Sequence, residues 1–234
     1  MPLLPYISDD HLIEYTKELV DSAISAQISV DKNPYKNVID PFSALIDSAR
    51  QGVSLDVWME QEKSRQIQKA FQNAVGKFHQ SILGAMPGWV DSGAGGSYDV
   101  INEDKKIIAE VKNKHNTMSS GQQTAVYDKM ANWLDYGKSG YTGYVVDIVP
   151  KNPTPYQKPF VPSERGVRRQ TRQNLLRIDG RSFYHLASGY EDAIDQLYFV
   201  LPKVLEGILN IDDSIMTNAA EFNTLFQKAY IKNK

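Results

Sequence analysis

Cysteine is absent from the 234-residue sequence, and histidine occurs four times, at well-separated positions. Without cysteine the chain has no disulfide, no thiol nucleophile and no thiolate ligand for zinc. Four scattered histidines offer little to a zinc site either. We therefore expect any bound metal ion to be held by oxygen ligands.

Long apolar runs are missing as well. No stretch approaches the roughly 18 consecutive apolar residues that a membrane-spanning helix needs. The first six residues, Met1 to Tyr6, carry neither the basic region nor the long apolar region of a secretion signal. The hydrophobic content of 41% is nevertheless enough for a substantial buried core. We expect a soluble protein of the cytoplasm.

The net charge of −2 hides an uneven distribution of charge along the chain. Residues 1–62 contain four Lys and Arg against eleven Asp and Glu, whereas residues 151–181 contain eight against two. A cationic segment inside a near-neutral protein is what a polyanion-binding surface needs, because phosphates are neutralised locally. The alternative is an ordinary solvated charged loop.

Hydrophobic periodicity predicts helices and strands in an α/β order. Apolar residues recur at steps of three and four from Ser54 to Gly84, which predicts a long amphipathic helix, and Asp40-Pro41 is a typical helix start. The other expected helices cover residues 8–28, 119–136, 191–209 and 213–230. The expected strands cover residues 98–101, 106–112, 141–149 and 181–186, with a glycine-rich turn at 92–97 and an irregular proline-rich segment at 151–162.

Three polar residues, Asp99, Glu110 and Lys112, interrupt two of these apolar strands. Successive side chains of a strand alternate between faces, so Glu110 and Lys112 share a face, and an antiparallel neighbour brings Asp99 beside them. Burying two carboxylates and an ammonium group is costly unless they pair with one another or bind a cation. The arrangement therefore points to a functional site.

A magnesium site explains these residues chemically. The carboxylates of Asp99 and Glu110, with the backbone carbonyl of Val111, form the hard-oxygen ligand set that Mg²⁺ prefers. The metal would polarise a phosphodiester and activate a water, which Lys112 would orient or help to deprotonate. The alternative is a cross-strand ion pair on a solvated sheet face, since Glu-x-Lys is common by itself.

These residues resemble the motif of the PD-(D/E)XK nucleases, whose core is a helix, a three-stranded meander, a helix and a strand. Tyr98 stands where the motif has proline. Longer segments are similar to the bacterial type II restriction endonucleases that cut GGNCC or GGWCC. The segments that carry this similarity are residues 110–117, 125–129, 143–151 and 178–184, within a region that spans roughly residues 55–201.

The resemblance implies a single nuclease domain over residues 1–234, with a mixed β-sheet flanked by helices and additional helices at both ends. We divide it into N-terminal helices (1–53), a catalytic core (54–150), a DNA-contacting insertion and strand (151–186) and C-terminal helices (187–234). The implied enzyme is a Mg²⁺-dependent homodimer that cuts double-stranded DNA at a short palindrome. A cognate methyltransferase would belong to the same system without direct contact. The alternatives are a repair or junction-resolving nuclease and a DNA-binding module without catalysis.

Two groups of residues are candidates for DNA contacts. The first group follows the catalytic strand directly, within reach of a phosphate or a base edge, and consists of Lys114, His115 and Asn116. The second group would share one face if the chain is helical from Glu164 onward, and consists of Arg165, Arg168, Arg169 and Arg172. Such arginines can read guanine in the major groove or contact phosphates alone, and both interpretations stay open.

Overall fold

The structure, a computed structural model, describes residues 2–93, 98–211 and 219–231. The chain forms two compact units, one of residues 1–16 and 78–234 and the other of residues 17–77. Both boundaries fall inside long helices, α1 (Asp9–Lys32) and α3 (Leu55–Gly84). The single nuclease domain over residues 1–234 stays a prediction.

The smaller unit consists of helices, and the helix that begins at Pro41 starts where the sequence predicts. Besides parts of α1 and α3 it contains η1 (Pro34–Lys36) and α2 (Pro41–Gln51). The side chain of Asp40 accepts a hydrogen bond from the Phe42 backbone N–H at 3.0 Å, and Pro41 occupies the first helical position. At the other end Gly52 has a φ of +68°, the left-handed conformation that commonly ends a helix.

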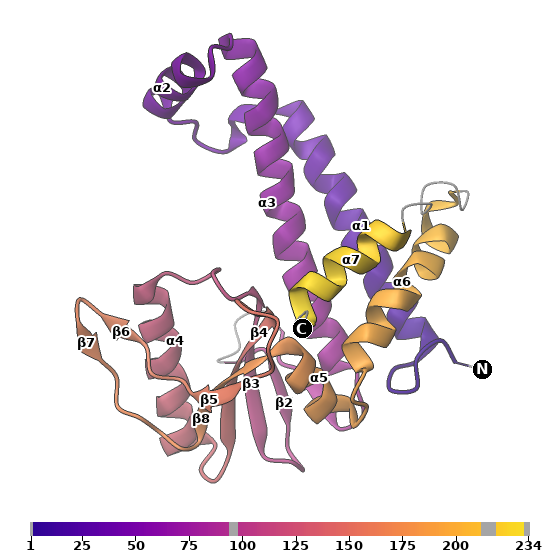
Figure 1. The fold of residues 1–234 in the computed structure, drawn as a ribbon, viewed down its shortest axis with the longest axis vertical. Helices are drawn as coiled ribbons and strands as arrows, with labels where there is room; N and C mark the ends of the chain where they lie inside the picture. The colour runs from indigo at the N-terminus through magenta and orange to yellow at the C-terminus, as the bar shows by residue number, and fades with distance from the viewer. Residues whose placement is uncertain (1, 94–97, 212–218, 232–234) are drawn as a thin grey trace. The chain divides into compact units, whose positions relative to one another are not determined.

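The larger unit is built around one mixed sheet of six strands (Figure 1). The strands follow one another across the sheet in the order β1 (Trp89–Asp91), β2 (Val100–Asn102), β3 (Ile107–Lys114), β4 (Thr142–Val149), β8 (Leu175–Asp179) and β5 (Gln157–Pro159). The first three form an antiparallel meander, whereas β3, β4 and β8 run parallel. The order of α3, meander, helix and strand confirms the predicted mixed α/β fold.

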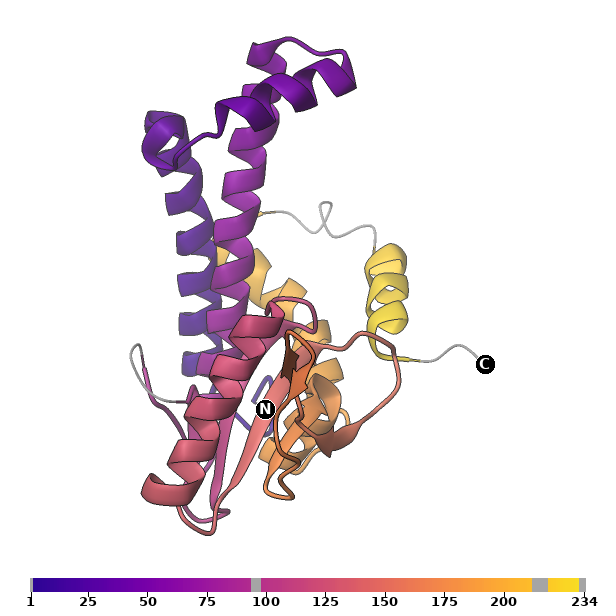
Figure 2. The ribbon, with the colours of Figure 1, turned by 90° about the vertical axis from the view of Figure 1, so that its left-hand side faces the viewer.

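Helices cover both faces of this sheet (Figure 2). On one face α4 (Ser120–Asn132) and the π-helical turn η2 (Trp133–Gly137) pack against Ile108, Val145 and Leu175 in one hydrophobic cluster. On the other face the ring of Phe183, from α5 (Gly180–Ser188), lies 5.8 Å from that of Tyr144. This burial from both sides explains the nearly continuous apolar sequence of β4, which is typical of a parallel strand.

The prediction of a strand over residues 181–186 is wrong. The strand is β8, and the chain turns into α5 directly after it. The reason is a cap, because the side chain of Asp179 accepts a hydrogen bond from the backbone N–H of Ser182 at 3.0 Å and so begins a helix.

The helix considered from Glu164 onward is also absent, and the four arginines therefore do not share a helical face. The segment folds instead into a hairpin of β6 (Ser163–Glu164) and β7 (Val167–Arg168), which lies beside α4 (Figure 1). Arg165 and Gly166 form its turn with φ values of +50° and +81°. An α-helix excludes such left-handed pairs, whereas tight hairpins require them.

The proline-rich segment holds more structure than the sequence predicts, because β5 pairs with β8. Pro159 is compatible with this position, since β5 lies at the edge of the sheet. Towards the C-terminus α6 (Ala193–Leu209) and α7 (Ala219–Tyr230) confirm two expected helices. The predicted start of the last helix, residues 213–218, and the glycine-rich residues 94–97 lie outside the described residues.

No helix in the part of the chain that the structure describes is both long enough and apolar enough to cross a membrane.

The junction between β8 and α5 yields a test of this packing. A Cβ atom on Gly180 would lie 2.3 Å from the backbone oxygen of Ile148, so Gly180→Ala forces strand β4 and helix α5 apart. We expect a loss of about 1–3 kcal/mol in the free energy of unfolding, measured by urea denaturation. Gly207→Ala is the control, because nothing lies within 4 Å of its Cβ position on α6, and it should stabilise by about 0.5–1 kcal/mol. Equal stability of Gly180→Ala and the unmodified chain would contradict this packing.

Candidate active site

Strand β3 presents Glu110 and Lys112 on the same face, as the alternation of its residues predicts. The Nζ atom of Lys112 lies 2.7 Å from Oε1 of Glu110. Glu110 is only 7% exposed, so this contact forms where little water competes for the charges.

Asp99 joins these residues from the start of the neighbouring strand. Its backbone N–H donates to the carbonyl of Ala109 at 2.9 Å, while its Oδ2 accepts from the backbone N–H of Val111 at 2.6 Å. The carboxylate thus takes the place of a backbone acceptor next to Glu110. The three predicted catalytic residues therefore gather at one position on β2 and β3.

The electrostatics of Asp99 and Glu110 favour a cation at this position. Burial and the negative charge of Glu110 raise the pKa of Asp99 above its usual value, against the opposing effects of Lys112, the Val111 N–H and Lys129. Two carboxylates so close together repel one another. A cation between them would relieve that repulsion.

Lys129 supplies a second ammonium group, which the sequence reasoning did not assign a role. It comes from α4, and its Nζ lies 3.7 Å from Oε2 of Glu110, the oxygen that Lys112 does not contact. Its side chain is 40% exposed. Glu110 is thus held from both sides, by Lys112 on its own strand and by Lys129 on the covering helix.

The donor set fits a small hard cation. No group of three His, Cys, Asp or Glu side chains suited to a metal occurs among residues 2–93, 98–211 and 219–231. The predicted side-chain ligands are Asp99 and Glu110, and the predicted backbone ligand is the carbonyl of Val111. Two carboxylates completed by waters are a usual arrangement for Mg²⁺.

Gln80 of α3 and Asp91 of β1 hold the Asp99 end of the meander, and neither was singled out in the sequence. The Nε2 atom of Gln80 donates to Oδ1 of Asp91 at 2.7 Å and lies 3.4 Å from the carbonyl of Asp99. The same carbonyl accepts from Ser92 N–H at 2.9 Å. These bonds fix the backbone from which the Asp99 carboxylate projects.

A second cluster of charges, also missed in the sequence, lies on the neighbouring strands β4 and β8, where Asp147 pairs in register with Lys112. Asp147 of β4 is fully buried and accepts from Nε and Nη2 of Arg177 at 2.7 and 2.9 Å. Its Oδ2 also contacts Nδ1 of His115 at 3.0 Å and the hydroxyl of Tyr156. The signal was present, because Asp147 and Arg177 are polar residues inside apolar strands, just as Glu110 is.

Asp147 contrasts with Asp99 in its pKa. Burial alone would raise the pKa of Asp147, but the hydrogen bonds from Arg177, Tyr156 and His115 outweigh it and lower the pKa below its usual value. Asp147 is therefore a satisfied anion, whereas Asp99 is not.

The residues predicted to contact DNA have different environments. Lys114 ends β3, and the side chain of His115 points at Asp147, while Asn116 is exposed. Arg169 forms a two-bond ion pair with Asp128 of α4 at 2.8 and 2.7 Å, and Arg172 forms another with Asp135. Within the described residues Arg165 and Arg168 form no ion pair.

Comparison with known proteins identifies the family of the chain. The model of the Eco47II restriction endonuclease family matches residues 4–210. The chain belongs to this family. Type II restriction enzyme Eco47II of Escherichia coli is 40% identical over 215 residues, which cover 90% of each chain. Type II restriction enzyme Sau96I of Staphylococcus aureus is 28% identical over 244 residues, or 99% of this chain and 91% of the relative. No solved structure matches.

Membership of the Eco47II family confirms the resemblance to type II restriction endonucleases. The chain is accordingly a DNA endonuclease of a restriction system. Type II restriction endonucleases generally use divalent metal ions, in keeping with the paired carboxylates of Asp99 and Glu110. The roles of the individual residues stay predictions.

The opposite pKa shifts of the two aspartates predict opposite effects of removing their charges. Asp99→Asn keeps an acceptor for the Val111 N–H but removes a disfavoured charge, so it should raise the melting temperature at pH 7.5 in EDTA. A folded-state pKa above the unfolded value of about 3.9 means that stability is lost as the pH rises. The gain should therefore disappear as the pH falls towards about 4.

Asp147→Asn is the matched comparison. Its lowered folded-state pKa means that the charge stabilises the fold above about pH 4 and that this contribution is lost as the pH falls further. We expect the variant to lose about 3–5 kcal/mol at pH 7.5, because Arg177 is left buried without its partner. A lower melting temperature for Asp99→Asn at pH 7.5 would contradict the repulsion between Asp99 and Glu110.

Proposed function

We propose that this enzyme hydrolyses double-stranded DNA at a short GC-flanked palindrome, GGNCC or GGWCC, with a magnesium-activated water. The observation that carries the chemistry is the grouping of Asp99, Glu110 and Lys112 through contacts of 2.6 and 2.7 Å. The recognition sequence rests on the resemblance stated from the sequence. Family membership favours this function over a repair nuclease or a DNA-binding module without catalysis.

Each residue of the proposed centre has its own role in the reaction. Asp99 and Glu110, with the carbonyl of Val111, would hold Mg²⁺, which when bound supplies a Lewis acid and a water of lowered pKa. Lys112 would orient that water and stabilise the negative charge that develops on the phosphate. Lys129 would keep the Glu110 carboxylate in place from the side of α4.

We assign the predicted DNA contacts to two surfaces. Lys114, His115 and Asn116 would contact DNA where β3 ends, next to the scissile phosphate. The exposed Arg165 and Arg168 of the β6–β7 hairpin would do so further away. Arg169 and Arg172 are engaged by α4 and η2, and we propose that they mainly hold the hairpin in position and reach DNA only if their ion pairs open.

We further propose a symmetric homodimer acting in the cytoplasm. One centre of Asp99, Glu110 and Lys112 hydrolyses one strand, whereas a palindrome presents the same half-site twice. A dimer with two-fold symmetry matches that arrangement with one self-complementary interface. A cognate methyltransferase would protect the same sequence without contacting the enzyme.

Removing the catalytic groups should separate cleavage from binding. We expect Lys112→Ala and Asp99→Ala each to lower the cleavage rate by at least about a hundredfold, because both act on the scissile phosphate. Affinity for a duplex, measured by gel shift in Ca²⁺, should change little, since Ca²⁺ fills an oxygen site without the geometry that Mg²⁺ imposes.

Lys203→Ala is the control for this experiment, because Lys203 is an exposed lysine of α6. It should cleave DNA like the unmodified enzyme. If Lys112→Ala also cleaved at the normal rate in Mg²⁺, the proposed centre would be wrong.

The recognition sequence and the dimer can be tested together. Digestion of a plasmid followed by sequencing of the ends should give cuts only at GGNCC or GGWCC, with a staggered end. Light scattering with a cognate duplex should give the mass of two chains on one duplex. Scattered ends, or one chain on each duplex, would instead favour a nuclease that recognises DNA shape, such as a repair enzyme.

A further inference from the structure

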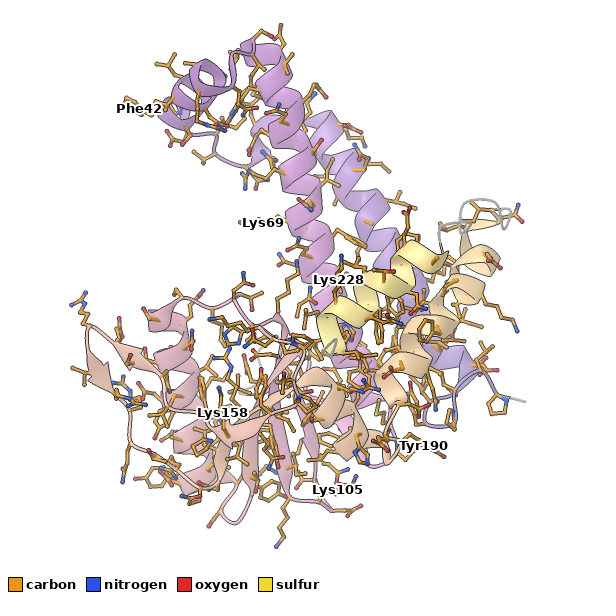
Figure 3. The ribbon with its side chains drawn as sticks, in the orientation of Figure 1. Phe42, Lys69, Lys105, Lys158, Tyr190 and Lys228 are labelled. Carbon is orange, nitrogen blue, oxygen red and sulfur yellow. The ribbon has the colours of Figure 1, made fainter. Side chains whose placement is uncertain are left out.

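A cavity of about 480 Å³ opens between the N-terminal part of α4, the end of β5, the hairpin and β8. Its polar lining comes from Gln123, Lys158, Arg168, Thr171 and Arg177, and it also includes the ring of Phe160. Lys158 of β5 is labelled in Figure 3. The volume is in the range of a small-ligand site and would accommodate a phosphate with its sugar.

The charges of this cavity are all positive. Lys158, Arg168 and Arg177 line it, and no carboxylate does. Within residues 2–93, 98–211 and 219–231, neither Lys158 nor Arg168 forms an ion pair. Arg177 is paired with Asp147, which does not line the cavity, so the uncompensated charges are those of Lys158 and Arg168, and an anion between them would be attracted by both.

Arg177 differs from the other two because it is rigid. It is 8% exposed, its Nε and Nη2 are bound to Asp147, and its Nη2 also donates to the carbonyl of His115 at 3.1 Å. Its Nη1 has only a long contact of 3.4 Å with Oε1 of Gln123. The guanidinium is thus a fixed donor with hydrogen-bonding capacity left at Nη1.

The remaining polar groups select the class of ligand. The Nε2 atom of Gln123 donates to the carbonyl of Met118 at 3.2 Å, so both ends of this amide are in use. Lys158, Arg168 and Arg177 can only donate hydrogen bonds. A phosphate offers acceptors in several directions, so it can take donors that approach from β5, the hairpin and β8 together, whereas the acceptors of a guanine edge lie in one plane. The cavity therefore favours a phosphate over a base.

The sheet fixes the distance of this cavity from the catalytic centre. Arg177 pairs in register with Val145, which in turn pairs with Glu110. Two strand spacings of about 4.8 Å place these backbones roughly 10 Å apart. Successive phosphates of one DNA strand rise about 3.4 Å along the helix axis and lie farther apart through space, so a separation of this order corresponds to one to three nucleotides.

We propose that this cavity binds a backbone phosphate of the DNA substrate, one to three nucleotides from the scissile phosphate, through Lys158, Arg168 and the fixed guanidinium of Arg177. The inference rests on the proposed function and extends it, because it gives the substrate a second anchoring point. Lys158 and Arg168 approach from two different elements, β5 and the hairpin. Arg177 connects the bound phosphate through Asp147 to the strands that carry the catalytic residues.

The test is a binding experiment with neutralised phosphates, performed in Ca²⁺ so that it does not depend on cleavage. Duplexes containing the determined cut site carry one neutral methylphosphonate at each position in turn, from one to four nucleotides on either side of the cut. One position should weaken binding by the unmodified enzyme by roughly tenfold. In the double variant Lys158→Ala with Arg168→Ala, the same replacement should have almost no further effect.

Salt dependence gives a second readout. The double variant should reduce the slope of log affinity against log salt by about one, because one phosphate is no longer neutralised, or by about two for a dimer. Lys203→Ala should keep the original slope. Both mutated side chains are exposed, and unchanged melting temperatures would show that the variants fold normally.

The outcomes separate this inference from the proposed function. If the unmodified enzyme neither binds nor cuts DNA in a sequence-dependent manner, the proposed function fails first. If it binds and cuts normally but the double variant keeps its salt slope and its sensitivity to every methylphosphonate, the phosphate cavity is wrong and the proposed function stands.

Discussion

The ion pair of Asp147 and Arg177 is the contact that holds together the strands from which the enzyme is proposed to act on DNA. It joins β4 to β8, and through the carbonyl of His115 it reaches the end of β3. Tyr156 and Gln123 extend it to the segment before β5 and to α4. Two buried charges are costly to desolvate, and the cost is offset only where hydrogen bonds satisfy their remaining lone pairs and protons, as they do here. Removing either partner would loosen the end of β3 and the segment before β5, two of the segments from which the enzyme is proposed to hold DNA.

Asp99, which is partly buried and lies just before β2, has the opposite balance of charges and hydrogen bonds. Asp147 has three donors and a lowered pKa, whereas Asp99 has one backbone donor, a carboxylate neighbour and a raised pKa. Satisfied charges stabilise a fold, while unsatisfied ones are tolerated where a ligand completes them. Asp147 thus stabilises the pairing of the strands, whereas the destabilising charge of Asp99 lies where a cation is proposed to bind.

The features that could be predicted from the sequence are those that depend on residues close together in the chain. Glu110 and Lys112 were found because polar residues at alternate positions of an apolar strand need a reason, and Asp99 because an antiparallel neighbour brings it close. Asp147 carries the same signal, but its partner Arg177 is 30 residues away, and sequence spacing does not reveal such a pair. The helix α5 and the β6–β7 hairpin were missed for a local reason. Each is decided by a single cap or turn, at Asp179 and at Arg165, against the preference of the surrounding residues.

Residues 151–181 show why a count of cationic residues overestimates the positive charge that is available to bind DNA. Of its eight cationic side chains, Arg169, Arg172, Arg177 and Arg181 form ion pairs with acidic residues from other elements. Two of these partners, Asp128 and Asp135, belong to α4 and η2, 41 and 37 residues away from their arginines. Such a pair lowers the net charge that the arginine offers to a phosphate, although Arg177 keeps hydrogen-bonding capacity at Nη1. The four cations of this segment without an ion pair among the described residues are Lys151, Lys158, Arg165 and Arg168. The paired arginines matter because Arg169 and Arg172 hold the hairpin against the helix beside the catalytic strands.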